Sequence, residues 1–148
     1  MSDGTATAHP FDIDAFLAQP LVARVAVAAP EPTVRPVWYL WEDGRFWWLT
    51  GGWSKLPAAL ARNPQVALVV DTCDLATGQT RQVSARGTAR VVPFDAEVTY
   101  RKLRRYLGAD RRAWDPRFRT YLSPADACLV RLSPERLVAK DLSFRPSK

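Results

Sequence analysis

Residues 33–50, TVRPVWYLWEDGRFWWLT, carry the clearest structural signal in the sequence. Two runs rich in aromatic and β-branched residues flank Asp43-Gly44, and an Asp-Gly pair between such runs is typical of a tight turn in a β-hairpin. Outward from this hairpin, residues 21–29 and 65–73 are apolar runs typical of buried strands, and residues 80–92 alternate as a long strand does. Residues 126–132 predict a last strand, followed by a turn at 133–135 and an extended tail. Consecutive strands joined by short turns favour antiparallel pairing, so the sequence predicts a closed or half-closed barrel of six or seven strands.

Three helical segments lie between these runs, and the barrel is expected to carry them on its outside. Asp12 is placed to cap a helix over 13–19, and Ser54 is placed to cap a helix that Asn63-Pro64 ends. Residues 93–108 predict a third helix that starts at Pro93 and ends at Gly108. Gly87 indicates a bulge in the long strand over 80–92. We expect a flexible terminus over 1–10 and a single domain over 11–148.

The charge of the chain narrows the class of partner without choosing one. The formal net charge is +6, and most of the excess lies in RKLRR, RR and RFR within 101–119. Such a balance suits nucleic acid, an acidic membrane surface or a phosphorylated small molecule. No apolar stretch approaches the ~20 residues that span a bilayer and no signal peptide is visible, so we expect a cytoplasmic protein without a membrane partner. His9 is the sole histidine and lies in the loose terminus, so we expect no metal site and assign no catalytic side chain.

Residues 50–55, TGGWSK, are the candidate binding loop. A lysine, a hydroxyl and free N–H groups at a helix start suit an anion, and Gly51 lets backbone approach a ligand closely. Pairing of the two strands of 33–50 is expected to bring Arg35 near Thr50, which would add a guanidinium to the site. The same residues also fit a plain structural role, in which Lys55 is solvated and Arg35 pairs with an acid.

Residues 33–70, TVRPVWYLWEDGRFWWLTGGWSKLPAALARNPQVALVV, and residues 80–92, TRQVSARGTARVV, resemble the pyridoxamine 5′-phosphate oxidase-like flavin-binding split-barrel superfamily. The resemblance covers roughly 13–92, with a looser similarity at LVRLSPERLVAKDLSF to members that use FMN or the deazaflavin coenzyme F-420. It implies a mainly β fold, namely a six-stranded antiparallel split barrel with helices packed outside. It also implies a homodimer with the cofactor between the two chains.

The resemblance assigns roles to individual positions. Arg35 and Lys55 match residues that bind the flavin phosphate, and Thr50 and Ser54 match hydroxyl positions in the same loop. Val37 and Trp38 lie on the strand that runs along the flavin ring. Gln82, with Arg81 beside it, matches a residue that reaches the flavin from the neighbouring subunit. Many members read Ser-Arg-Lys in the loop, whereas here Trp53 precedes Ser54 and the arginine is missing.

The implied function is a flavin-dependent oxidoreductase that binds FMN, or alternatively F-420, and transfers hydride to or from a small organic substrate. One alternative is a non-catalytic protein that sequesters the cofactor. A less favoured one is a small basic nucleic-acid-binding barrel, because the aromatic residues and the arginines cluster in different segments. Of the six tryptophans, Trp53 and Trp38 are expected near the cofactor, since neighbouring side chains on a strand face opposite ways. The arginines of 101–119 would serve either a solvated helix face or the acidic tail of F-420.

Overall fold

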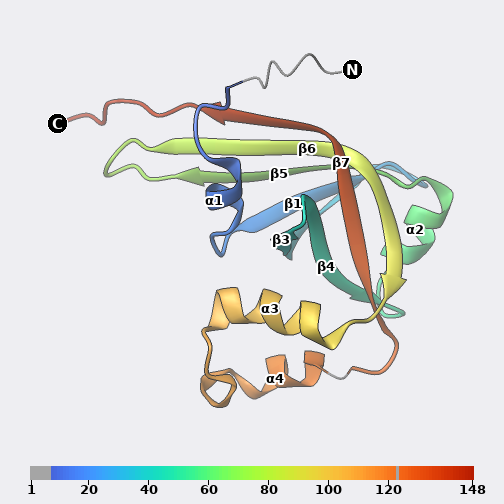
Figure 1. The fold of residues 1–148 in the computed structure, drawn as a ribbon. Coiled ribbons are helices and arrows are strands. Elements are labelled where there is room, and N and C mark those ends of the chain that lie inside the picture. The colour runs from blue at the N-terminus through green and yellow to red at the C-terminus, as the bar shows by residue number, and fades with distance from the viewer. Residues whose placement is uncertain (1–7, 123) are drawn as a thin grey trace.

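One curled antiparallel sheet forms the body of the protein in this computed structural model, which describes residues 8–122 and 124–148. The strand order is β2-β1-β5-β6-β7-β4-β3, so the predicted antiparallel β fold is confirmed (Figure 1). Residues 1–7 of the terminus predicted to be loose lie outside the described residues. The elements are α1 (Ile13–Leu17), β1 (Val22–Val27), β2 (Thr33–Trp38), β3 (Leu40–Glu42), β4 (Arg45–Gly51), α2 (Leu56–Arg62), β5 (Gln65–Cys73), β6 (Thr80–Pro93), α3 (Ala96–Leu107), η1 (Arg111–Ala113), α4 (Pro116–Arg119), η2 (Thr120–Leu122) and β7 (Ala127–Asp141).

The described sheet has seven strands rather than six because the run predicted as one strand is interrupted at Tyr39. Before Tyr39 the chain belongs to β2, at one edge of the sheet, and after it to β3, at the other edge. The chain at Tyr39 thus joins the two edge strands of the curled sheet, which do not pair with each other. We call the gap at Tyr39, between the end of β2 and the start of β3, the seam. The hydroxyl of Tyr106 fills the backbone gap: it accepts from the Tyr39 N–H at 3.0 Å and lies 2.6 Å from the Leu21 carbonyl oxygen, to which it donates.

The Asp-Gly hairpin and the bulge at Gly87 are both present. Asp43 and Gly44 join β3 to β4 with φ values of 55° and 69°, as a two-residue hairpin turn requires. The pairing of β6 with β7 shifts register between Arg86 and Gly87, and a Cβ at Gly87 would collide with the Ser133 carbonyl oxygen. Because glycine allows this close approach, β7 runs as one bulged strand through residues 133–135, where the sequence suggested a turn.

The main hydrophobic core fills the inside of the curled sheet, and α1 contributes to it. Asp12 caps α1 as predicted, its carboxylate accepting from the Ala15 N–H at 3.1 Å. Phe16 and Leu17 of α1 are buried in the same cluster as Trp48 and Phe46 of β4. A smaller cluster on the opposite face of β4 joins Leu40 and Leu129 to α3.

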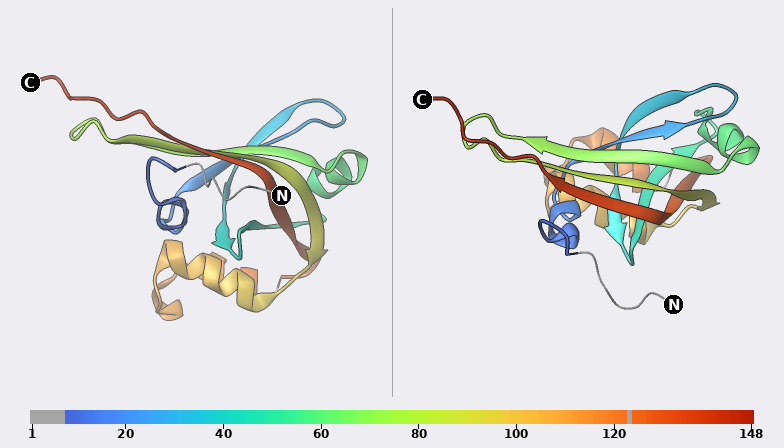
Figure 2. Two further views of the ribbon diagram at one scale, coloured as in Figure 1. Left: turned by 45° about the horizontal axis from the view of Figure 1, so that its top comes forward. Right: turned by 90° about the horizontal axis from the view of Figure 1, so that it is seen from above.

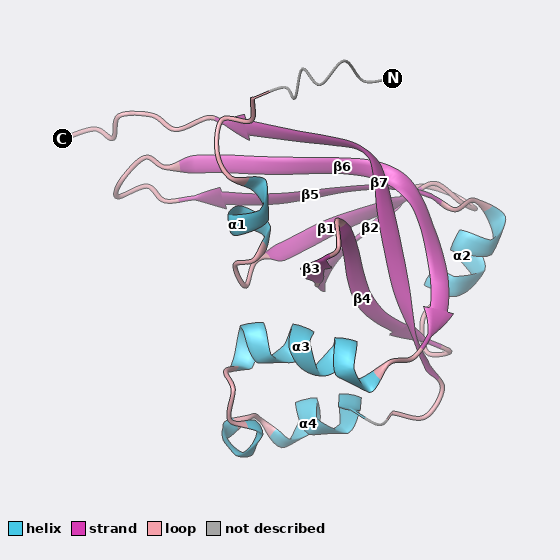
Figure 3. Cartoon of the chain, viewed as in Figure 1, coloured by secondary structure: helices cyan, strands magenta, loops and turns pink. Residues whose placement is uncertain are grey.

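The helices α2, α3 and α4 lie outside the sheet (Figures 1 and 3). The α3 helix begins at Ala96 rather than Pro93, because Asp95 supplies the cap and Pro93 still belongs to β6. Figure 2 shows the β5–β6 hairpin and the C-terminal tail extending together away from the body of the barrel. In the described residues, no helix has the length and apolar character needed to cross a membrane.

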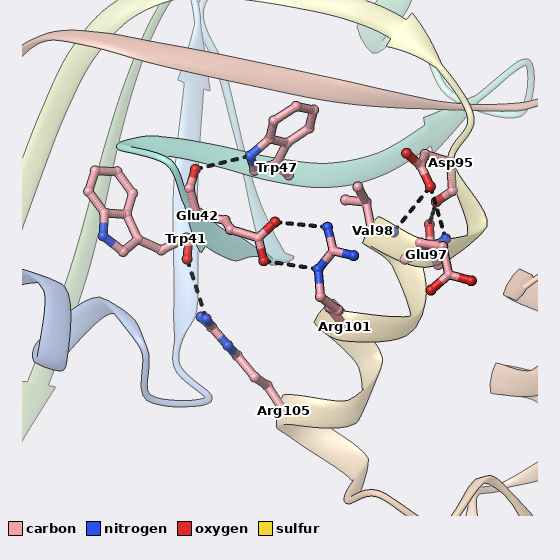
Figure 4. Close-up of polar contacts among 9 residues, drawn as sticks. Trp41, Glu42, Trp47, Asp95, Glu97, Val98, Arg101 and Arg105 are labelled. Carbon is pink, nitrogen blue, oxygen red and sulfur yellow. Dashed lines mark hydrogen bonds and ion pairs between the residues drawn. The ribbon is translucent and has the colours of Figure 1, made fainter.

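Several arginines of the segment 101–119 contact other groups of their own chain, and Figure 4 shows two of them, Arg101 and Arg105. Arg101 forms a two-point contact with Glu42, at 3.0 and 2.8 Å, and Arg105 donates to the Trp41 carbonyl at 3.3 Å. Arg111 lies over the ring of Tyr100 with its guanidinium carbon 4.1 Å from the ring centre. The contacts of Arg101 and Arg105 attach α3 to β3. The segment therefore packs against the sheet on one side and faces solvent on the other.

Candidate functional site

The loop that follows β4 is held tightly against the segment before β7. The N–H of Gly52 donates to the Asp126 carbonyl at 3.1 Å. A Cβ on Gly51 would collide with that same carbonyl and with the Trp53 ring, and a Cβ on Gly52 would collide with the Asp126 carboxylate. Both positions thus require glycine for close packing. Sequence reasoning missed Asp126, which is brought here only by the pairing of β4 with β7.

The start of α2 offers fewer backbone donors than the sequence suggested. The predicted cap at Ser54 is wrong by one position: Lys55 is the N-cap residue of α2 and its side chain does not cap the helix. The Ser54 hydroxyl accepts from the Leu56 N–H at 3.1 Å. Pro57 has no N–H, and α2 is only 7 residues long. Lys55 is exposed, and its ammonium group makes no described hydrogen bond or ion pair. Any anion held here would therefore rely on the Lys55 ammonium more than on the helix backbone.

Arg35 lies on the inner face of edge strand β2. It is paired with the fully buried Val25, and residues directly opposite in a sheet share a face. The expected direct pairing of its strand with the one ending at Thr50 is wrong, because the interruption at Tyr39 leaves β3 as the hairpin partner of β4. Arg35 on β2 and the buried Thr50 on β4 both face the inside of the curled sheet. One guanidinium nitrogen of Arg35 donates to Thr33 Oγ1 at 3.2 Å.

Several buried polar atoms near these positions have no hydrogen-bond partner among the described residues. Arg35 Nε, Thr50 Oγ1 and Arg81 Nε are three of the five, and all three residues belong to the predicted cofactor site. The other two, Tyr39 Oη and Trp48 Nε1, belong to buried residues of the main core. Burial raises the pKa of the Tyr39 hydroxyl, which keeps it neutral. An unpartnered buried donor or acceptor is costly, so these atoms mark places where a bound group or water adds stability.

Arg81 and Gln82 lie far along the sheet from the binding loop of the same chain. Gln82 is opposite Lys140 of β7, while Gly51 is opposite Ala127 at the other end of that strand. At about 3.3 Å per residue, roughly 40 Å of strand separates these two points. Arg81 and Gln82 also face opposite ways, and Arg81 faces inward toward Asp141 and the Phe11 ring. The structure does not bring them to the loop within one chain.

The two tryptophans expected near a cofactor have different surroundings. Trp53 is 59% exposed on the loop. Trp38 is half-buried and stacks on Tyr106, with ring centres 4.4 Å apart, and on Phe118 at 5.3 Å. Val37 is half-buried and packs against the main core. The buried Trp48 and Trp41 are core residues, as expected.

A cavity of about 560 Å³ lies beside Trp53. This volume is in the range of small-molecule sites. No charged side chain lines it among the described residues, and its walls carry two exposed aromatic rings. The lining residues are Leu49, Trp53, Thr120, Tyr121, Pro124 and Ala125.

Lys102 is a buried cation that sequence reasoning did not single out. It lies on the buried face of α3, one turn from both Val98 and Tyr106, and it makes no described hydrogen bond or ion pair. Burial lowers the pKa of its ammonium group to about 8. Its place in the apolar face of the helical pattern is the signal that could have identified it.

Comparison with known proteins finds one matching family and several solved structures with a similar fold. The sequence model described as "Pyridoxamine 5'-phosphate oxidase" matches residues 12–140. No curated protein matches the chain. The conserved hypothetical protein Rv2991 from Mycobacterium tuberculosis has a similar structure, with a TM-score of 0.73 and 20% identity over 91% of this chain and 88% of that one.

Other similar structures bind different cofactors. A FAD-binding protein from Mesorhizobium loti has a TM-score of 0.61 and 20% identity, covering 88% of this chain and 92% of its own. An F-420 reductase has a TM-score of 0.63 and 23% identity, covering 86% and 97%. The haem storage protein HutZ from Vibrio cholerae has a TM-score of 0.64 and 18% identity, covering 84% and 89%. At these identities the likeness establishes the fold.

Proposed function

The chain belongs to the pyridoxamine 5′-phosphate oxidase family, and from that premise we propose that it is an oxidoreductase that binds FMN, or alternatively F-420, between two copies of itself. It would use the cofactor to transfer hydride to or from a small organic substrate. The observation that carries the proposal is the pair of unpartnered buried polar atoms on Arg35 and Thr50. Residues predicted to hold a cofactor keep donors or acceptors that their own chain does not satisfy.

The residues of the loop suit the phosphate end of such a cofactor. Lys55 supplies a free ammonium, Arg35 an unsatisfied guanidinium N–H, and Thr50 a hydroxyl that either donates or accepts. The negatively charged Asp126 carboxylate beside Gly52 repels an anion, so the phosphate would lie on the side of the loop away from Gly52. When bound, the cofactor supplies the hydride chemistry. The protein positions it and excludes water, which explains why no catalytic side chain is needed.

The cavity beside Trp53 suits the substrate. Its walls are aromatic and aliphatic, and no described charge lines it. An uncharged planar molecule is therefore the favoured class of substrate, because a charged one would lose solvation without gaining a partner. Trp53 belongs both to this cavity and to the loop that holds Lys55, which links substrate and cofactor.

The position of Gln82 supports a site shared between two chains. Within one chain Gln82 lies on β6, opposite Lys140, too far along the sheet to reach the loop. A second copy supplies a Gln82 from outside, and an isologous pair then forms two equal sites. Unpaired apolar surface on the outer side of the sheet, including the 70% exposed Val34, supports such an interface.

An absorbance titration of the purified protein with FMN and with F-420 tests cofactor binding. We expect one of them to bind at micromolar concentration and Lys55→Ala to weaken binding at least about tenfold, through loss of a charge-assisted contact. Lys148→Ala, at the exposed C-terminus, is the matched control and should bind normally. If neither cofactor binds, the proposal fails. If Lys55→Ala binds as well as the native protein, the phosphate lies elsewhere.

Mixing two inactive variants tests the shared site. In a dimer of one Lys55→Ala chain and one Gln82→Ala chain, one site carries both substitutions and the other carries neither. Random mixing should therefore restore about a quarter of the sites. Absence of restoration, with each variant dimeric by sedimentation, would place Gln82 outside the site.

Cofactor storage without turnover is the second candidate, since the described lining of the cavity holds no carboxylic acid, histidine, lysine or cysteine for proton transfer. The two functions separate in one measurement. Reduced cofactor on the protein is mixed with a neutral quinone, and its reoxidation is compared with that of free cofactor. Faster reoxidation on the protein, abolished by blocking the cavity with Ala125→Trp, supports the oxidoreductase; slower reoxidation supports storage.

A further inference from the structure

A second concave surface, distant from the binding loop, lies on the outer face of β6 and β7. It has a volume of about 230 Å³ and holds three cations and one hydroxyl. We call it the cationic pocket. It is lined by Ser84, Ala85, Arg86, Arg136, Val138 and Lys140.

The register of the two strands forces like charges together in this pocket. Arg86 of β6 is directly opposite Arg136 of β7, at the point where the bulge begins. Like charges directly opposite each other destabilise an antiparallel pair. Lys140 lies four residues along the same strand and on the same face, so it adds to the repulsion.

The acidic side chains of this part of the sheet are engaged with other groups. Asp71 pairs with Arg24 at 2.7 Å, and Asp141 lies 3.6 Å from Arg81. Glu135, in the bulge itself, accepts from Thr88 Oγ1 at 3.0 Å. Within residues 8–122 and 124–148, no ion pair involves any of the three cations of the cationic pocket.

We propose that the cationic pocket binds a compact polyanion, whose phosphate or carboxylate oxygens bridge Arg86 and Arg136. A guanidinium fork matches such oxyanions in geometry, and two opposed forks with a nearby ammonium suit a ligand of two or more negative charges. The Ser84 hydroxyl supplies a further donor. None of its lining residues belongs to the predicted cofactor site, so the proposal goes beyond the flavin proposal. Lys140 is nevertheless directly opposite Gln82, so the pocket adjoins the predicted contact with the partner's flavin.

Titration with inorganic pyrophosphate at constant ionic strength tests the site. We expect Arg136→Gln to weaken pyrophosphate binding, measured by calorimetry, at least about tenfold. Arg104→Gln, which removes an exposed arginine of α3, is the matched control and should bind as the native protein does. A parallel titration with citrate distinguishes the source of the oxyanion: tighter pyrophosphate binding indicates a phosphate ligand, and tighter citrate binding indicates a carboxylate ligand.

Thermal unfolding supplies a second readout that a purely structural arginine would not give. Without anion, Arg136→Gln should raise the melting temperature, because the repulsion is relieved. With pyrophosphate, the native protein should gain stability and the variant should not.

Three results would overturn the proposal. One is an equal response of Arg136→Gln and Arg104→Gln to pyrophosphate. Another is loss of pyrophosphate binding in Lys55→Ala, which would assign the anion to the flavin loop. The third is dissociation of the dimer by Arg136→Gln with unchanged pyrophosphate affinity, which would make the cationic pocket a contact for the partner chain. Failure of flavin binding leaves all three measurements interpretable, so the two proposals fail separately.

Discussion

Two regions of the molecule are rich in cations, and they use them in opposite ways. In the segment 101–119 the arginines are adjacent in sequence, and the structure turns several of them toward the chain's own carboxylate, carbonyls and rings. In the cationic pocket the cations are spread from residue 86 to residue 140, and the pairing of β6 with β7 brings them together without an acid.

The contrast shows that the density of charge along a sequence does not reveal which charges are free. A run on one helix presents several side chains to whatever that helix packs against, so its cations find partners locally. Cations that strand register brings together need not find such partners, because the residues around them come from distant parts of the sequence. The free positive charge is therefore expected on the sheet rather than on the helix.

The largest effect that sharpens this contrast is expected at Lys102, the buried cation of the helical segment. Its pKa of about 8 is below the ordinary value of 10.5, so Lys102→Met should raise the free energy of unfolding at pH 7 by about 2–3 kcal/mol. Urea unfolding measures the change. Lys140→Met, in the cationic pocket, is the matched control and should change stability by less than about 0.5 kcal/mol.

The pH dependence of this effect has a definite sign. Burial lowers the folded-state pKa of Lys102 to about 8, so between pH 8 and 10.5 the unfolded chain binds the extra proton and native stability rises with pH. The advantage of Lys102→Met should accordingly fall below about 1 kcal/mol at pH 10. A variant that is less stable than the native protein at pH 7 would show that the ammonium has a partner the fold requires.

A smaller change in unfolding free energy is expected at Tyr106, whose hydroxyl reaches from α3 to the backbone groups at the seam. Tyr106→Phe removes the acceptor of the Tyr39 N–H and the donor to the Leu21 carbonyl. Leaving these groups unpaired should cost about 2 kcal/mol in unfolding free energy. Tyr100→Phe, whose hydroxyl makes only a 3.5 Å contact with the Ala109 carbonyl, should cost far less. Equal costs would mean that water replaces the Tyr106 hydroxyl at the seam.

The smallest expected effects are at Arg101 and Arg136, where the free energy of unfolding should change in opposite directions. Arg101→Gln should lower the free energy of unfolding by about 0.5–1 kcal/mol, because the contact with Glu42 is two-pointed but its side chains are 43% and 34% exposed. Arg136→Gln should act in the opposite direction at low salt. Both changes should shrink in 1 M NaCl, where charges are screened within about 3 Å. Losses of stability in both variants would remove the distinction between the two regions.

The parts of the fold that depend on local chemistry could be predicted from the sequence. Asp43-Gly44 sets the hairpin, Asp12 caps α1, and Gly87 allows the bulge, and each of these needs only a few adjacent residues. The interruption at Tyr39 could not be predicted, because it depends on a hydroxyl 67 residues away. A run of strand-forming residues gives no local sign that it changes partner strand.

The candidate site divides in the same way. The loop over residues 50–55 and its glycines follow from local pattern and from the family resemblance. Asp126 and the opposition of Arg86 to Arg136 follow from strand register. The face on which Arg35 lies likewise becomes clear only from its pairing with Val25.

Because the Tyr39 amide is bonded to the Tyr106 hydroxyl, its hydrogen exchange reports on the motion of α3. Amides inside the strands exchange with solvent deuterium only when the sheet opens, since their acceptors are neighbouring strands. The Tyr39 amide is bonded to a side chain of α3, so it exchanges whenever that helix lifts, even while the sheet stays intact. The exchange rate of the Tyr39 amide therefore measures how often α3 separates from the barrel.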